Sequence, residues 1–142
     1  MQHLNFIFTL TILIVTLTGN LFFSENSESK KDKNARIQFN ELKYDFGKVE
    51  EGIQLSHIFK FKNTGEETLI IKSVNAGCGC TGVTVGDKKE YREGEEGEIK
   101  VSFNTQGRSG IQSKSVYVQT NDPEKPNIDL IFTCEVISTK KN

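Results

Sequence analysis

Apolar side chains recur at every second position in several separate stretches of this sequence. The stretches are residues 37–46, 55–61, 99–103, 116–118 and 128–136. A period of two places one set of side chains on one face of a β-strand, whereas a helix requires a period near 3.6. No stretch after residue 36 keeps a helical period. The sequence therefore predicts an all-β domain.

Turn-forming residues separate the predicted strands at regular spacing. These turns are Gly47 with Gly52, Asn63-Thr64-Gly65, residues 104–110 and Asn121-Asp122-Pro123. Two more apolar stretches, residues 69–74 and 83–85, add further strands. About seven strands with this spacing are typical of an immunoglobulin-like β-sandwich, in which each sheet contributes one apolar face to a shared core. We place this domain at residues 37–138.

The N-terminal segment, residues 1–23, is predicted to form a hydrophobic helix. Residues 6–17 are apolar apart from threonines, which is typical of an export signal or a membrane anchor. The segment contains no cysteine for lipid attachment and no clear cleavage site, so a signal peptide and an uncleaved signal anchor both stay open. Either one predicts an exported protein of the periplasm or cell envelope, associated with the membrane if the segment is uncleaved.

Polar residues flank the predicted sandwich on both sides. Residues 24–36 are rich in charge and are predicted to be a linker, and residues 139–142 form a polar tail. The basic residues of the linker would oppose export of the domain if the anchor were uncleaved. The whole chain carries 18 basic and 19 acidic residues, a balance that excludes the basic footprint of a nucleic-acid-binding protein.

The hexapeptide from Ala76 to Thr81 holds two of the three cysteines, Cys78 and Cys80, on either side of Gly79. Because Gly79 has no Cβ, the chain can bend there and bring the two sulfurs into disulfide range. As thiolates, Cys78 and Cys80 would supply two of the four ligands of a copper or zinc site. As thiols, they would be small buried side chains in a turn. The sequence leaves all three options open, and no other cofactor is expected.

Two other residues of possible chemical interest share faces with apolar side chains. His57 lies on the face of Leu55 and Phe59, which favours a neutral, hydrogen-bonded core histidine over a ligand. Cys134 lies on the face of the last strand and is predicted to be a buried structural thiol. The acidic residues between positions 87 and 98 lack the order of a calcium-binding loop, so we expect a solvated loop. No catalytic triad, nucleophile elbow or phosphate-binding loop is found in the sequence.

An ordered set of short motifs runs through most of the predicted domain. It consists of Phe46-Gly47-Lys48-Val49, Glu51-Gly52, His57-x-Phe59-x-Phe61-Lys62-Asn63-Thr64-Gly65, Leu69-x-Ile71, Val74, Cys78-Gly79-Cys80-Thr81, Gly94-Glu95, Val101-x-Phe103-Asn104 and Val118-x-Thr120-Asn121-Asp122-Pro123. Over roughly residues 40–137 this order resembles the bacterial envelope family called domain of unknown function 1573, which is common in Bacteroidetes.

The resemblance implies an immunoglobulin-like domain similar to the hydin and major-sperm-protein group, in an exported protein. The family's Cys-Gly-Cys-Thr motif maps onto Cys78, Gly79, Cys80 and Thr81, and its histidine onto His57. The resemblance implies no catalytic residue in this sequence. We therefore expect a non-catalytic binding or scaffolding module with an envelope protein as partner. The alternative is a thiol-redox or copper- or zinc-handling protein that uses the Cys-Gly-Cys motif.

Overall fold

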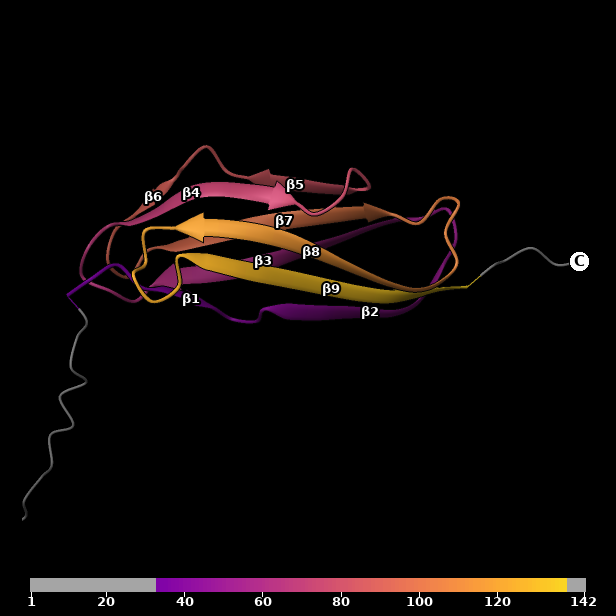
Figure 1. Ribbon diagram of the computed structural model, residues 1–142, viewed down its shortest axis with the longest axis horizontal. Coiled ribbons are helices and arrows are strands. Elements are labelled where there is room, and N and C mark those ends of the chain that lie inside the picture. Colours follow the sequence, from indigo (N-terminus) through magenta and orange to yellow (C-terminus); the bar gives the residue numbers. More distant parts are fainter. Residues whose placement is uncertain (1–32, 138–142) are drawn as a thin grey trace, which may run out of the picture.

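The structure, a computed structural model, describes residues 33–137 and contains nine β-strands in this range (Figure 1). The strands are β1 (Ile37–Phe39), β2 (Lys43–Glu50), β3 (Gln54–Asn63), β4 (Leu69–Ala76), β5 (Thr81–Val85), β6 (Glu90–Tyr91), β7 (Glu96–Asn104), β8 (Gly110–Thr120) and β9 (Asn127–Ile137). The predicted N-terminal helix at 1–23, most of the linker and the tail at 139–142 lie outside the described residues. No helix able to span a bilayer occurs between residues 33 and 137.

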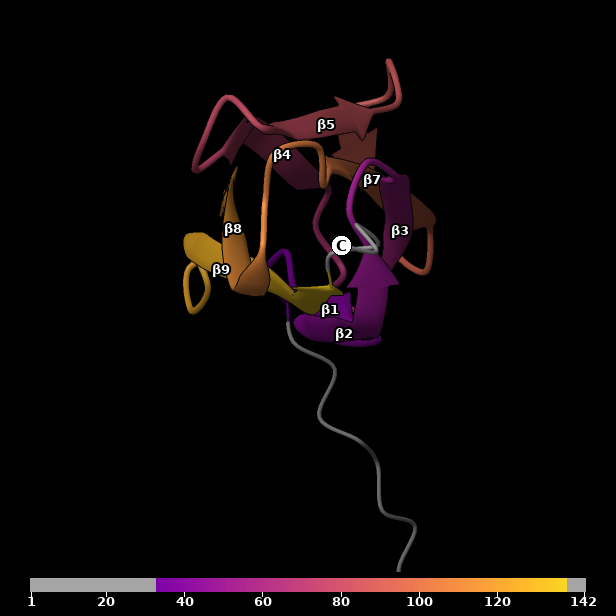
Figure 2. The ribbon, with the colours of Figure 1, turned by 90° about the vertical axis from the view of Figure 1, so that its right-hand side faces the viewer.

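The strands form two sheets that pack face to face, as the view along the strands shows (Figure 2). One sheet has the order β1-β3-β7-β5 and the other the order β2-β9-β8-β4-β6. Every neighbouring pair is antiparallel except β2 and β9, which run parallel. The predicted all-β sandwich is confirmed.

The expected count of about seven strands is wrong, because the sequence interpretation merged or omitted short ones. The stretch at residues 37–46 was expected to be one strand, but β1 pairs with β3 in one sheet and β2 pairs with β9 in the other. The alternation slips by one residue between Phe39 and Leu42, where the chain crosses between the sheets. The two-residue strand β6 lies in the predicted charged loop and pairs with β4.

The core lies between the two sheets and is dominated by aromatic side chains. Phe59, Phe61 and Phe103 come from one sheet and Phe132 from the other, and all four are almost fully buried. Phe132 joins the layers, because its ring centroid lies 5.8 Å from that of Phe103. It also lies 5.9 Å from that of Phe46 on β2. The burial of these rings provides the main free energy of association between the sheets.

The predicted turn at residues 63–65 is fixed by a buried polar side chain, Asn63. The Asn63 amide accepts from the backbone N–H groups of Arg36 and Gly65 and donates to the carbonyls of Glu67 and Tyr91, at 2.8–3.2 Å. All four hydrogen-bonding positions of this amide are therefore occupied. An added Cβ at Gly65 would collide with the backbone of Asn34, so only glycine fits this turn.

Candidate functional site

The Cys-Gly-Cys turn connects β4 to β5 and carries the chain from one sheet to the other. Cys78 and Cys80 are joined by a disulfide with their Cα atoms 5.4 Å apart. The N–H of Gly77 donates to the carbonyl of Ser115 on β8 at 2.9 Å, and the N–H of Thr81 donates to the carbonyl of Cys78 at 3.2 Å. Of the three options left open by the sequence, the structure has the disulfide.

The two sulfurs of this disulfide have different surroundings. Cys80 packs against the core cluster. Cys78 lines a polar cleft of about 260 Å³ together with Lys114 and Tyr117 of β8, and its Sγ lies 3.3 Å from the hydroxyl oxygen of Thr81. Both cysteines are half-buried, and Cys78 is the one of the pair that lines this cleft. In the oxidised state neither sulfur is a thiolate, the form that copper or zinc requires.

His57 lies on β3, separated from β5 by the strand β7. Its ring stacks on Tyr44 of the opposite sheet, with the centroids 3.7 Å apart, and its Nε2 lies 3.0 Å from the carboxylate of Glu41. Phe59 contacts the ring edge-on at 4.7 Å. Four predicted site residues, Cys78 to Thr81, are therefore adjacent in one turn, whereas the contacts of His57 are with aromatic residues and Glu41.

Metal-ligating groups do not converge elsewhere in the part of the chain that the structure describes. No group of three or more His, Cys, Asp or Glu side chains suited to a metal ion is found among residues 33–137. In the acidic segment, the carboxylate of Glu95 accepts from Lys88 at 2.9 Å and from the N–H of Arg92 at 2.6 Å. The Lys88 hydrogen bond is the main cause of the lowered pKa of Glu95. Glu95 thus organises its own loop.

Cys134 is a buried free thiol on β9, as predicted. Burial raises its pKa, and the nearby carboxylate of Asp45 raises it further. Because the thiolate is the reactive form, a raised pKa keeps Cys134 inert near neutral pH. This cysteine therefore belongs to the core and takes no part in the chemistry of the turn.

The sequence interpretation missed the free edge of β5. On one side β5 pairs with β7, and on its other side no described strand is hydrogen-bonded to it. Edge strands are usually protected by charges, proline or a bulge, and β5, with the sequence TGVTV, has none of these. By contrast, the edge strand β2 has a register shift between Asp45 and Lys48. The uncharged run at 81–86 was the available signal in the sequence.

A family model matches nearly the whole described domain. The model of a family described as "Protein of unknown function (DUF1573)" matches residues 37–136. A search of curated proteins finds no match.

Solved structures with the same fold come from several organisms. A protein of unknown function from Porphyromonas gingivalis W83 is 16% identical with a TM-score of 0.65, covering 78% of this chain and 51% of that one. The ASH/PapD-like domain 7 of human CEP192 is 8% identical with a TM-score of 0.58, covering 80% and 93%. The VesB protease of Vibrio cholerae is 11% identical with a TM-score of 0.56, covering 72% and 31%. This chain spans about half the length of the Porphyromonas protein, and the likeness extends to the immunoglobulin-like fold alone.

Proposed function

This chain belongs to the DUF1573 family, and from that premise we propose that it is an exported immunoglobulin-like module of the cell envelope. In this proposal it binds or scaffolds an envelope protein and catalyses no reaction. The fold alone supports many roles, so a role for this protein has to come from features of this chain. The observation that carries the proposal is the free, unprotected edge of β5.

An unprotected edge strand is a template for a partner strand. Its outward backbone N–H and C=O groups can hydrogen-bond to an extended segment, and exposed side chains then select the sequence. On β5 the side chain of Thr84 is exposed, while Thr81 is buried and Val83 is half-buried. The disulfide immediately precedes this strand and limits the motion of its first residue. A fixed edge loses less conformational entropy on binding than a mobile one.

Two features support the proposed compartment. Disulfides persist in oxidising compartments such as the bacterial periplasm and are rare in the cytosol. The Cys78–Cys80 disulfide therefore favours an exported domain. The apolar segment at residues 6–17, typical of an export signal or anchor, favours the same location.

Photo-crosslinking in cells tests the binding role. A photoreactive residue at Gly86, where a side chain would meet no neighbouring atom, would sit at the end of β5 in the full chain. A second photoreactive residue at Gln119, exposed on the inner strand β8, is the matched control. We expect a discrete protein adduct from position 86 only, and we expect Thr84→Lys to abolish it. Equal adducts from both positions, or an adduct unaffected by Thr84→Lys, would contradict the proposal.

A thiol-redox role is the second candidate, and the contact of Cys78 with the polar cleft favours it. A thiolate of a partner dithiol would attack Sγ of Cys78, form a mixed disulfide and release Cys80 as a thiolate. The second thiol of the partner would then attack the partner's sulfur in the mixed disulfide and release Cys78 as a thiolate. The partner ends with a disulfide, and Cys78 and Cys80 are both reduced. An unchanged thiol state of envelope proteins in cells with the Cys78→Ser, Cys80→Ser double variant would exclude this role.

A further inference from the structure

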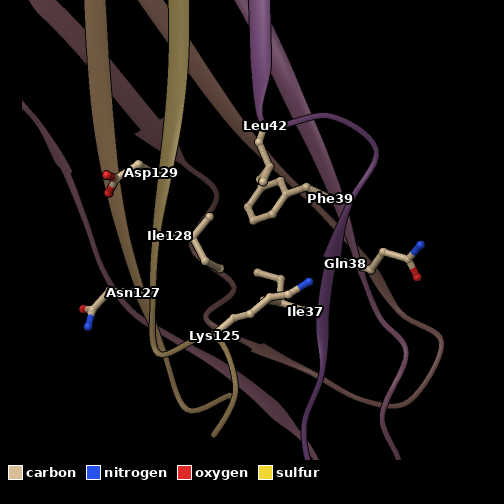
Figure 3. A pocket seen from close by; sticks show the side chains of 8 residues that line it. All are labelled: Ile37, Gln38, Phe39, Leu42, Lys125, Asn127, Ile128 and Asp129. Carbon is tan, nitrogen blue, oxygen red and sulfur yellow. The ribbon is translucent and has the colours of Figure 1, made fainter.

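A groove of about 350 Å³ lies between β1 of one sheet and the beginning of β9 of the other (Figure 3). Ile37, Phe39, Leu42 and Ile128 converge on it from both sides. Leu42 is 48% exposed, although it is a large aliphatic residue. Ile37 and Ile128 are buried at the base of the groove, whereas Leu42 and the half-buried Phe39 present apolar surface to water, and displacement of that water gives an apolar occupant a driving force for binding.

The wall of the groove formed by β9 has free backbone groups. Along a strand, the N–H and C=O groups of successive residues point to opposite sides. The N–H of Ile131 donates to the carbonyl of Leu42 at 2.8 Å, so the odd-numbered residues of β9 face the side of β2. The pairing with β2 begins at Ile131, opposite Lys43. Asn127 and Asp129 therefore direct their backbone groups to a place where no described strand pairs with them.

The wall of the groove formed by β1 also has backbone groups that no described strand pairs with. The carbonyl of Arg36 and the N–H of Asn40 bond to the β3 side, so the even-numbered residues face β3 and the odd-numbered residues face away. The N–H of Ile37 is taken by the carboxylate of Asp122 at 2.9 Å. The carbonyl of Ile37 and both backbone groups of Phe39 then face away from β3, on the edge where no described strand pairs with β1.

Strand β2 shows how this chain itself covers the same opening further along. It runs parallel to β9 from the Lys43–Ile131 pair onward and directs Tyr44 and Phe46 inward. Tyr44 stacks on His57 of the opposite sheet and thereby spans the gap between the layers. The pairing of β2 with β9 begins only at Lys43, because the residues before it connect β2 to β1 in the other sheet. The groove is the uncovered continuation of that line.

The rim of the groove carries one cation directed over the apolar side chains. Lys125 extends across the opening toward Ile37, whereas Asn127 and Asp129 point away from it (Figure 3). Among the described residues Lys125 has no ion pair. An acidic group on the occupant would therefore find a complementary charge beside the groove, with the interaction weakened by salt because the site is exposed.

We propose that this groove binds an extended segment of a partner protein that has an apolar side chain flanked by an acidic group. The segment adds to β9 along the line of β2, hydrogen-bonds to Asn127 and Asp129, places its apolar side chain against Leu42 and Ile128, and its acid near Lys125. The inference rests on the proposed binding function, but it concerns a surface distinct from the edge of β5. The crosslinking at β5 and the groove test below can therefore fail independently.

The test selects short random peptides displayed on phage against the oxidised full chain in detergent micelles. We expect the enriched peptides to share alternating apolar residues and an acidic residue. Leu42→Glu should weaken their binding by about tenfold or more, because it places a charge where the apolar side chain docks. Ile111→Glu, at an aliphatic residue that is 83% exposed on β8, is the matched control and should leave binding unchanged.

Two further comparisons examine the mode of binding. N-methylation of the peptide at alternate residues should abolish binding for the set that faces β9 and spare the other set, because in the proposed arrangement the segment forms backbone hydrogen bonds with β9 and none with β1. Lys125→Glu should weaken the binding of acidic peptides and leave the binding of their amide analogues unchanged. Lys72→Glu on β4 should change the binding of neither kind of peptide.

The proposal is overturned if no peptide is enriched, if Leu42→Glu and Ile111→Glu have equal effects on binding, or if both methylated sets bind alike. It is also overturned if the full chain self-associates in solution and Leu42→Glu makes the oligomer dissociate, because the occupant of the groove is then a second copy of this chain.

Discussion

At the scale of single residues, the polar side chains of the turns stabilise the fold. Asp122 is almost fully buried, and its carboxylate accepts from the N–H groups of Ile37 and Glu124, both at 2.9 Å, and from Arg36 at 2.8 Å. Burial alone would raise the pKa of Asp122, but these hydrogen bonds outweigh it and hold the pKa below its usual value. Asp122 thereby fixes the first strand of the domain to the turn between β8 and β9.

We expect Asp122→Asn to lower the free energy of unfolding by about 3 kcal/mol at neutral pH, because Arg36 and the backbone donors lose a buried negative charge. Since the pKa of Asp122 is lowered by folding, its contribution is fully present above the pKa of the unfolded chain. That pKa is about 3.9, and the contribution is lost as the pH falls further, through the folded pKa. Urea unfolding at several pH values should show a weaker acid dependence in Asp122→Asn.

Glu124→Gln is the control for this experiment. The Glu124 side chain is 69% exposed and contacts the same arginine at 2.8 Å. Exposed ion pairs contribute little, so Glu124→Gln should change stability by about 1 kcal/mol or less. An equal loss in both variants would show that the buried hydrogen bonds of Asp122 are not the cause.

At the scale of elements, the sequence predicted most of the strands but not how the chain exchanges sheets. The alternating patterns located the longer strands, because period two follows directly from strand geometry. The split between β1 and β2 was signalled only by the one-residue slip before Leu42. The pairing of two residues in β6 depends on β4, which is distant in sequence, and no local pattern carries that information.

The candidate site was predictable to a similar degree. The spacing of Cys78 and Cys80 allowed a disulfide without requiring it, because the choice depends on the bend at Gly79 and on the hydrogen bond from Gly77 to Ser115. The free edge of β5 and the groove beside β9 depend on sheet order. Sheet order is a non-local property, so neither surface could be identified from alternation alone.

We expect removal of the disulfide by Cys78→Ser and Cys80→Ser together to destabilise the domain by only about 1.5 kcal/mol, because the closed loop is very short and loop-closure entropy grows with loop length. The effect should be local. Amide exchange should become faster in β5, which follows the turn, and stay unchanged in β3. Cys134→Ser, at the buried free thiol, should leave exchange in β5 as it is. Unchanged exchange in β5 of the double variant would show that the disulfide does not hold this edge.

At the scale of the whole molecule, one aromatic cluster unites the two sheets. Phe132 of β9 contacts Phe103 of the opposite sheet and Phe46 of its own sheet. Both sheets bury their apolar faces only against each other, so neither has a core of its own. The described domain should therefore unfold in a single cooperative transition.

We expect Phe132→Ala to lower the free energy of unfolding by about 3–5 kcal/mol, since it removes a ring that is 1% exposed and leaves a cavity between the sheets. Tyrosine fluorescence and circular dichroism should give coincident guanidinium transitions in the parent chain. Tyr117→Ala, at an aromatic residue that is 48% exposed on β8, should lower the free energy of unfolding far less than Phe132→Ala does. Separate transitions for the two probes would mean that the sheets unfold independently.

The parallel pairing of β2 with β9 also determines how the domain carries mechanical load. In the described chain, β2 lies near the beginning and β9 at the end, and the two strands point in the same direction. A tension that pulls the start of β2 and the end of β9 apart would act along both strands in opposite senses. The hydrogen bonds between them would then be sheared together, whereas an antiparallel hairpin pulled at its ends opens one bond at a time. The geometry is therefore that of a strand pair that resists being pulled apart at the start of β2 and the end of β9.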